Sequence, residues 1–285
     1  MIAFVNGQFV PEEDAVVSVF DRSFLYGDGL FETLLVLSGK PFRWSQHLER
    51  LHRGADFLRI HVPFQPDDLL RFLDQLVTTN DMPHALLRLT LSRGTGLRGY
   101  SPSGADRPFL VMTLHPAPPL EPNPPARWRM VTASGCLPAH EPLAQFKTCN
   151  KLPQILARSE ADAAGAHEAL LLNTNGAVVE AASSNLFWIH NGGIVTPPLG
   201  SGVLPGVTRA VVIEICQALG LSIREDNVTV KQLLQFEGIF LSLSSVGIVE
   251  AVSLDGQTLR QSHLTGEIRS AYNALLRSET AAAPP

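Results

Sequence analysis

The chain has 285 residues, of which 45% are hydrophobic, and it carries a formal net charge of −5. It is long enough to bury one large core or two ordinary ones, and without a run of like charges it lacks the basic surface expected of a nucleic-acid-binding protein. Three cysteines, Cys136, Cys149 and Cys216, are too few, odd in number and too widely spaced to form a disulfide framework or a zinc site of the CxxC kind.

No targeting or membrane segment is predicted. Residues 1–11 lack the basic start and the long apolar run of a secretion signal, and no apolar stretch is long enough to span a bilayer. The nine histidines show no HExxH arrangement. We therefore expect a cytoplasmic protein that acts on a small molecule, with no membrane partner, no nucleic-acid partner and no bound metal.

The first part of the chain alternates strand and helix patterns. An Asn6-Gly7 turn between apolar runs predicts a hairpin over residues 3–10. Apolar residues at helical spacing follow a Ser45 cap and predict a helix to about residue 60. The remaining patterns are two strands and a second helix, at residues 31–37, 85–91 and 66–80. A smaller, mixed α/β domain is therefore expected over residues 1–114.

Residues 115–125 form the clearest break in composition, reading His-Pro-Ala-Pro-Pro-Leu-Glu-Pro-Asn-Pro-Pro. Because proline removes a backbone donor and favours extended conformations, this segment predicts a linker. Residues 126–285 then predict a larger, sheet-centred α/β domain, so the fold class is α+β with two domains. Its strands are expected at 128–133, 168–173, 177–180, 184–190, 238–243 and 247–252, and its helices at 150–164, 206–219 and 262–277.

Lys147 is the first candidate for chemistry. Only four of the 22 basic residues are lysines, at positions 40, 147, 151 and 231. Lys147 directly precedes a helix expected to begin near Asn150, and the positive field of a helix N-terminus lowers the pKa of an amine. A neutral amine is the form that attacks an aldehyde. The alternative is an ordinary solvated lysine in a loop.

Two features are suited to binding a phosphate group. The turn at Pro205-Gly206 leads into an apolar helix and leaves the amides of Val207 and Thr208 unpaired at its first turn, where amides bind phosphate. Thr208 could instead be a plain helix cap. Arg50 lies at the edge of an apolar helical stripe, where it could clamp a phosphate or extend to solvent.

A carboxylate and a loop complete the candidates. Glu180 ends an apolar strand, so it either lies at the surface or, if buried, needs a cation such as a protonated ring nitrogen. The loop from Arg93 to Tyr100, which includes Arg98, suits an anionic substrate. The alternative for this segment is a flexible loop with solvated arginines.

Two glycine patterns are similar to nucleotide-binding motifs. A GxGxxG pattern over residues 94–99 follows a strand, but the turn-rich residues 101–108 stand in place of the helix that would hold a pyrophosphate. A GxGxxxG pattern over residues 200–206 does precede a helix. A nucleotide-dependent oxidoreductase therefore stays open as a distant alternative.

Several motifs together resemble the class IV aminotransferases, the fold-type IV group of pyridoxal phosphate enzymes, in the same order along nearly the whole chain. The group includes branched-chain and D-amino-acid aminotransferases and aminodeoxychorismate lyase. The matching segments are 21–33, 47–51, 93–100, 146–150, 180–185, 204–209 and 240–245. The resemblance implies the two-domain fold-type IV architecture, with the smaller domain first.

The resemblance also implies roles for individual residues. Lys147 would hold pyridoxal 5'-phosphate as a Schiff base and move the substrate proton, while Glu180 would keep the ring nitrogen protonated. The residues implied to hold the phosphate group are Arg50, Val207, Thr208 and Ser244. A homodimer is implied as well, in which the arginine-bearing loop of one subunit reaches toward the active site of its partner.

Within the group, residues 93–100 look most like the corresponding loop of the lyase, and Thr33 stands at the place of a lyase threonine that assists proton transfer. The implied activity is 4-amino-4-deoxychorismate lyase, which forms p-aminobenzoate and pyruvate in folate biosynthesis; the alternative is an aminotransferase of the same class. Phe31 and Tyr100 stand where D-amino-acid aminotransferases bind the substrate carboxylate, and Arg98 is retained there. A substrate with amino and carboxylate groups is implied in either case.

Overall fold

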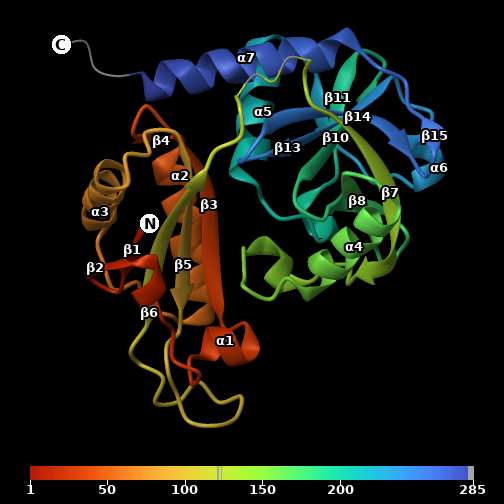
Figure 1. Cartoon of the computed structure of the whole chain (residues 1–285). Coiled ribbons are helices and arrows are strands. Elements are labelled where there is room, and N and C mark those ends of the chain that lie inside the picture. Colours follow the sequence, from red (N-terminus) through yellow and green to blue (C-terminus); the bar gives the residue numbers. More distant parts are fainter. Residues whose placement is uncertain (121, 123, 282–285) are drawn as a thin grey trace. The chain divides into compact units, whose positions relative to one another are not determined.

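The computed structural model describes residues 1–120, 122 and 124–281. The chain divides into two compact units (Figure 1). The N-terminal unit consists of Met1–Pro118, Phe146–Asn150 and Arg277–Pro285, and the C-terminal unit consists of Pro119–Gln145 and Lys151–Leu276. Residues 121 and 123 of the expected linker lie outside the described residues.

A six-stranded antiparallel sheet is the centre of the N-terminal unit, with the strand order β2-β1-β6-β5-β3-β4 (Figure 1). Its strands are β1 (Ile2–Val5), β2 (Gln8–Pro11), β3 (Gly29–Leu37), β4 (Lys40–Pro41), β5 (Ala85–Ser92) and β6 (Phe109–Pro116). β1 and β2 form the predicted hairpin, and Asn6 and Gly7 both have the positive φ that this turn requires. β6 is not predicted from the sequence, and it takes the first two residues of the expected linker into the sheet.

Two helices, α2 (Trp44–Leu58) and α3 (Pro66–Thr79), share an apolar core with this sheet. Side chains alternate along β5, so Leu87, Leu89 and Leu91 are buried in that core while Leu86, Arg88 and Thr90 are less buried. The predicted Ser45 cap is wrong. The N-cap is Arg43, two residues before Ser45; it is in the left-handed conformation, and no side-chain hydrogen bond caps the helix. The unit also contains α1 (Arg22–Tyr26) and the short 3-10 helix η1 (Glu12–Asp14).

The C-terminal unit is built on a larger mixed sheet (Figure 1). The described strands follow the order β12-β11-β10-β13-β14-β7-β8-β9, with β15 paired to β14, and the pairs β11–β12, β14–β7 and β7–β8 are parallel. Their bounds are β7 (Arg127–Leu137), β8 (Glu168–Asn173), β9 (Val178–Ala181), β10 (Asn185–His190), β11 (Gly193–Thr196), β12 (Ile223–Glu225), β13 (Gly238–Leu243), β14 (Gly247–Leu254) and β15 (Gln257–Thr258). The α+β class is therefore confirmed.

Helices connect these strands, and their bounds are α4 (Leu152–Ala163), α5 (Val207–Ala218), α6 (Val230–Leu233) and α7 (His263–Thr280), with short 3-10 helices η2 (Pro142–Gln145) and η3 (Leu199–Ser201). α4 begins two residues after the predicted start at Asn150. Pro153 occupies its first turn, where a missing N–H costs nothing. No helix in the described part of the chain is long and apolar enough to cross a membrane.

Candidate functional site

Lys147 lies on an edge of the N-terminal sheet. Its carbonyl accepts a hydrogen bond from the amide of Phe31 at 2.9 Å, and the amide of Cys149 donates to the carbonyl of Gly29 at 2.9 Å. Residues 147–149 thus extend the sheet antiparallel to β3. The expectation that Lys147 directly precedes a helix N-terminus is wrong, because pairing with β3 keeps this segment extended and α4 begins further along the chain.

The ring of Phe31 contacts two cationic side chains, those of Lys147 and Arg88. The Nζ atom of Lys147 lies 4.6 Å from the centre of the Phe31 ring, and Cζ of Arg88 lies 3.7 Å from the same centre. Thr33 faces the same side of the sheet as Phe31, because side chains alternate along a strand, and it lies opposite Arg88 in the register of β3 and β5. We call Phe31, Thr33, Arg88 and Lys147 the lysine cluster.

Arg88 is a member of the lysine cluster that sequence reasoning missed. It is the single charged residue of β5, which reads Ala-Leu-Leu-Arg-Leu-Thr-Leu-Ser. This one charge within an apolar strand is the signal that could have identified it. Burial lowers the pKa of Arg88, but a guanidinium stays protonated in a protein. The lysine cluster therefore carries a permanent positive charge suited to a carboxylate.

Arg50 is buried and forms a bidentate ion pair with Glu32, so the alternative in which it extends to solvent is wrong. Nε and Nη2 of Arg50 donate to the two carboxylate oxygens at 2.8 and 2.6 Å. Nδ1 of His47 lies 2.7 Å from Oε2 of Glu32, which makes it the protonated nitrogen of that ring. Glu32 thus fixes the orientation of the Arg50 guanidinium.

The charges of these three residues depend on one another. Burial raises the pKa of the Glu32 carboxyl, but the charge and hydrogen bonds of Arg50, with the hydrogen bond of His47, outweigh burial and hold the pKa at about 2. Burial lowers the pKa of His47, and the positive charges of Arg50 and Lys147 lower it as well. The carboxylate of Glu32 raises this pKa, but by less than the other effects lower it. The native group therefore contains an anion, a cation and a neutral imidazole.

Acid should destabilise the protein through this group. Ionised Glu32 stabilises the fold above the ordinary carboxyl pKa of 4.5, and this contribution is lost as the pH falls toward about 2. Neutral His47 acts in the same direction, because the unfolded chain binds its proton below pH 6.5. We expect the free energy of unfolding in urea to fall between pH 4.5 and 3 more steeply in the native protein than in Glu32→Gln. Equal slopes would contradict this account.

In the C-terminal unit, Glu180 holds the turn that precedes α5. Oε2 of Glu180 accepts a hydrogen bond from the amide of Leu204 at 3.0 Å, and Nδ2 of Asn185 donates to the carbonyl of Leu204 at 2.9 Å. Glu180 is buried, so the surface alternative for it is wrong. A Cβ on Gly206 would lie 2.0 Å from Oδ1 of Asn185, so any larger residue here would displace the Asn185 amide. Asn185 is a supporting residue to which the sequence assigned no role.

The predicted phosphate-binding residues of this unit meet at the start of α5. Gly206 is the N-cap and offers no side-chain hydrogen bond, so the alternative in which Thr208 is a helix cap is wrong. Oγ1 of Thr208 lies 3.3 Å from Oγ of Ser244, in the turn between β13 and β14. A helix start without a side-chain cap, next to two hydroxyl groups, could hold a phosphate group.

The first glycine of residues 94–99 serves close backbone packing. Gly94 has a φ of 87°, and a Cβ there would lie 1.8 Å from the carbonyl oxygen of Arg107. No helix follows within residues 101–108, which agrees with the rejection of a dinucleotide-binding loop.

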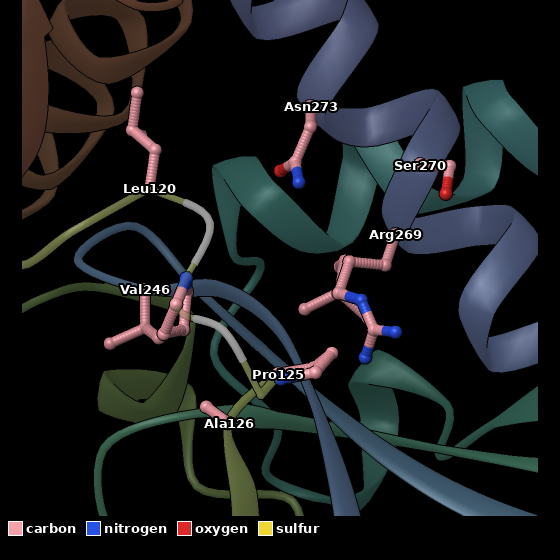
Figure 2. A pocket seen from close by; sticks show the side chains of 9 residues that line it. Leu120, Pro125, Ala126, Val246, Arg269, Ser270 and Asn273 are labelled. Carbon is pink, nitrogen blue, oxygen red and sulfur yellow. The ribbon is translucent and has the colours of Figure 1, made fainter.

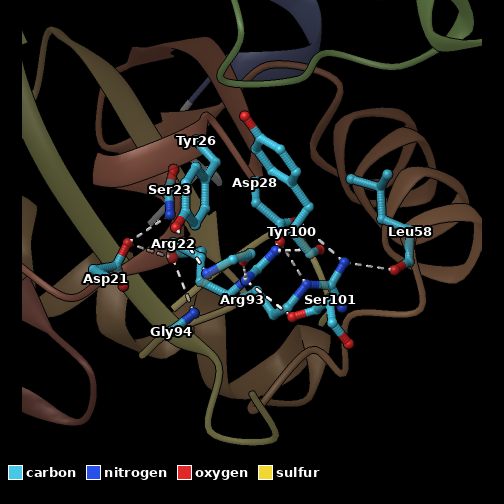
Figure 3. A network of polar contacts seen from close by, with 12 residues as sticks. Asp21, Arg22, Ser23, Tyr26, Asp28, Leu58, Arg93, Gly94, Tyr100 and Ser101 are labelled. Atoms are coloured by element: carbon cyan, nitrogen blue, oxygen red, sulfur yellow. Dashed lines mark hydrogen bonds and ion pairs between the residues drawn. The ribbon is translucent and has the colours of Figure 1, made fainter. Parts of the chain in front are cut away.

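Arg93 does not belong to the exposed part of this loop. It is buried and donates to both carboxylate oxygens of Asp28 and to the carbonyls of Leu58 and Arg59 (Figure 3). The interpretation of Arg93 as a substrate contact is therefore wrong, because its donors bind the carbonyls at the end of α2 and the partly buried carboxylate of Asp28. Arg98 and Tyr100 are exposed and stay candidates for substrate binding.

A cavity of about 170 Å³ in the C-terminal unit is separate from these residues. Figure 2 shows Arg269 and Asn273 of α7 beside Val246 and Pro125 at this cavity. Neither Glu180, Thr208 nor Ser244 lines it. Within the described residues no group of His, Cys, Asp and Glu side chains could hold a metal ion.

Known proteins with similar sequences and structures fall in one family. The family model described as Amino-transferase class IV matches residues 29–254. A provisionally named branched-chain-amino-acid aminotransferase of Methanocaldococcus jannaschii is 33% identical over 268 residues, covering 94% of this chain and 92% of that protein. The aminodeoxychorismate lyase of Bacillus subtilis is 30% identical over 278 residues, covering 97% and 94%.

The fold leads to the same family. The crystal structure of the Escherichia coli branched-chain amino acid aminotransferase superposes with a TM-score of 0.91 at 27% identity, covering 98% of this chain and 95% of that one. The predicted fold-type IV architecture is confirmed, and the oxidoreductase alternative has no support. The chain therefore belongs to the class IV aminotransferase family and is a pyridoxal phosphate enzyme, an aminotransferase or a lyase of that class.

Proposed function

We propose that Lys147 binds pyridoxal 5'-phosphate covalently and that Glu180 pairs with its ring nitrogen. The residues proposed to hold the phosphate group are Arg50, Val207, Thr208 and Ser244. The observation that carries this proposal is the turn before α5, where a buried carboxylate and two hydroxyls meet a helix start without a side-chain cap. The carboxylate fits a cation, and the hydroxyls with the amides of the helix start fit a phosphate group. When bound, the cofactor draws electrons from the substrate.

The remaining roles are proposed for residues of the lysine cluster and of the loop. Nζ of Lys147 takes up and returns the substrate proton, and the hydroxyl of Thr33, on the same side of the sheet, assists that transfer. Phe31 limits where Nζ can lie. The positive charges of Arg88 and Arg98 attract substrate carboxylates, and Tyr100 contributes a hydroxyl.

We favour 4-amino-4-deoxychorismate lyase as the activity. In this reaction Nζ of Lys147 accepts the ring proton and the bond between the ring carbon and the enolpyruvyl oxygen breaks. The enolpyruvate that leaves takes up a proton to become pyruvate, and the aromatic ring that remains is p-aminobenzoate. The hydroxyl of Thr33 supports the lyase, since Thr33 lies on the same face of β3 as Phe31, whose ring contacts Lys147. Similarity to the Bacillus subtilis lyase over nearly the whole chain supports it as well.

An aminotransferase is the second candidate. It is favoured by the relative from Methanocaldococcus jannaschii and by Arg88, a half-buried cation that contacts the same Phe31 ring as Lys147 and suits an amino acid carboxylate. This enzyme would use the same lysine to shift a proton within the substrate and would pass the amino group to a keto acid.

One assay separates the two reactions. The protein loaded with pyridoxal 5'-phosphate is given 4-amino-4-deoxychorismate, and p-aminobenzoate is followed; D- and L-amino acids with 2-oxoglutarate are run in parallel. We expect the native protein to release p-aminobenzoate rapidly. The variant Thr33→Val should release it about 10²-fold more slowly. Keto-acid formation without p-aminobenzoate would establish an aminotransferase and remove the proposed role of Thr33.

We also propose that the protein forms a homodimer in the cytoplasm. Two neighbouring phenylalanines, Phe20 and Phe24, are 68% and 69% exposed, and Val16 and Val19 near them are exposed as well. Apolar side chains grouped at the surface in this way are typical of an interface. Sedimentation velocity should give twice the chain mass, and a monomer at micromolar concentration would contradict the proposal.

A further inference from the structure

We infer that Arg22 is a positioning residue that sets the shape of the loop over residues 98–101 and thereby aims Arg98 and Tyr100 at the substrate. This inference rests on the proposed function, in which that loop binds a substrate carboxylate. Arg22 itself does not contact substrate in this scheme. It acts through the main chain of the loop.

One guanidinium binds three consecutive carbonyl groups of the loop (Figure 3). Nη1 of Arg22 donates to the carbonyls of Gly99 at 2.9 Å and Ser101 at 3.1 Å, and Nη2 donates to that of Tyr100 at 3.0 Å. Arg22 is 4% exposed, so water competes little for these hydrogen bonds. Since the carbonyls are turned inward, the backbone between them has few other conformations available.

Arg22 is in turn held by a partly buried carboxylate, that of Asp28. Its Nε donates to Oδ2 of Asp28 at 2.7 Å, and Arg93 donates to the same carboxylate at 2.8 and 3.0 Å. The two guanidinium groups, by their hydrogen bonds and charges, lower the pKa of Asp28 although burial alone would raise it. Arg93 continues to the carbonyls at the end of α2. A continuous polar connection therefore joins α2 to the loop, through Arg93, Asp28 and Arg22.

The loop has little apolar packing of its own. A cavity of about 520 Å³ lies between Leu58, the last residue of α2, with the residues that follow it to His61, and the segment from Ser101 to Pro108. Leu97 and Tyr100 are 77% and 87% exposed. Without an apolar core beneath it, the loop depends on its hydrogen bonds, and Arg22 provides three of them.

Two neighbouring features are adapted to this arginine. A Cβ on Gly96 would lie 3.2 Å from Cδ of Arg22, so glycine leaves room for the arginine stem. The ring of Tyr26 lies 5.1 Å from Cζ of Arg22, and its hydroxyl accepts a hydrogen bond from the amide of Gly99 at 3.3 Å. The guanidinium fork is what allows one side chain to bind a carboxylate and several carbonyls, which a lysine with one nitrogen does not reproduce.

The test is the variant Arg22→Lys, which keeps the positive charge beside Asp28 and removes the fork. We expect the backbone amides of residues 96–101, 103 and 104 to exchange hydrogen for deuterium at least about tenfold faster than in the native protein. KM for the carboxylate-bearing substrate should rise about tenfold or more while kcat stays within about twofold, because a charge-assisted contact to substrate is misplaced and the reacting groups are not. The absorbance of the bound cofactor should not change.

The matched control is Arg209→Lys. Arg209 is another buried arginine, in the C-terminal unit, and it donates to the carbonyl of Pro197 and to the carboxylate of Glu225. This variant should lower the denaturation midpoint and leave both the exchange of residues 96–104 and KM unchanged. Native exchange in Arg22→Lys, or fast exchange with native KM, would overturn the inference. If the native protein turned over no amino or carboxylate substrate at all, the proposed function would fail, whereas the exchange measurement would still report whether Arg22 holds the loop.

Discussion

Lys147→Ala should have no measurable turnover, a loss of roughly 10³-fold or more in kcat, because the amine proposed to hold the cofactor and move the substrate proton is removed. The backbone of residue 147 is fixed by a main-chain hydrogen bond to β3, which does not depend on the side chain. Alanine should therefore keep the strand pairing and the fold, so the loss reports chemistry.

The measurement is intact mass after borohydride treatment of the protein loaded with pyridoxal 5'-phosphate. The native protein should gain the mass of one reduced cofactor, and Lys147→Ala should gain none. Lys231→Ala, in which an exposed lysine of α6 is replaced, is the control and should gain the adduct and retain activity. An adduct that persists in Lys147→Ala and maps to another lysine would refute the assignment.

Elements with a local signal could be predicted from the sequence. The hairpin around Asn6-Gly7 and the helices α2 and α3 follow from turn chemistry and from periodic apolar residues, which act over a few positions. β6 was missed because it follows a turn-rich loop and ends within the proline-rich segment, where composition hides a strand. The register between β3 and β5, which brings Thr33 opposite Arg88, has no local signal of its own.

The predictions from sequence were wrong where contacts between residues far apart in the chain determine the structure. Arg93 was expected to reach substrate, but the carboxylate of Asp28, 65 residues away in the sequence, binds its guanidinium and turns it away from solvent. Lys147 was expected before a helix, but its segment pairs with β3, which the residues around it do not indicate. Arg50 and Glu180 were each left with two interpretations, one exposed to solvent and one buried. Both side chains are buried and hydrogen-bonded, so the solvent-exposed interpretation is wrong for each.

The order of motifs identified the candidate site more completely than any single motif did. Ser244 lies 36 residues after Thr208 in the sequence, yet the sheet brings the turn after β13 to the start of α5. The supporting residues Glu32 and Asn185 were not assigned roles, because each acts through another side chain or a main-chain group. Such roles depend on geometry that appears only in the folded chain.

Glu180→Gln should lower kcat roughly 10²- to 10³-fold while the protein keeps its fold and its cofactor. The glutamine oxygen can still accept the hydrogen bond from the amide of Leu204, so the turn before α5 should be maintained. What the variant lacks is the negative charge that keeps a ring nitrogen protonated, and without it the cofactor draws electrons less strongly. The loss should therefore appear in kcat more than in KM.

The matched control is Glu168→Gln, the same change at another buried carboxylate of the C-terminal sheet. Glu168 accepts hydrogen bonds from Ser183 and from the amide of Ala169, so its loss should lower stability and leave kcat within about twofold. Steady-state kinetics and the absorbance spectrum of the bound cofactor, recorded for both variants between pH 6 and 9, separate the two effects. Native kcat in Glu180→Gln would assign the ring nitrogen to another partner. A loss of kcat in Glu180→Gln alone, with cofactor retained, would mean that the charge of Glu180 serves the reaction and that its hydrogen bond to Leu204 serves the fold.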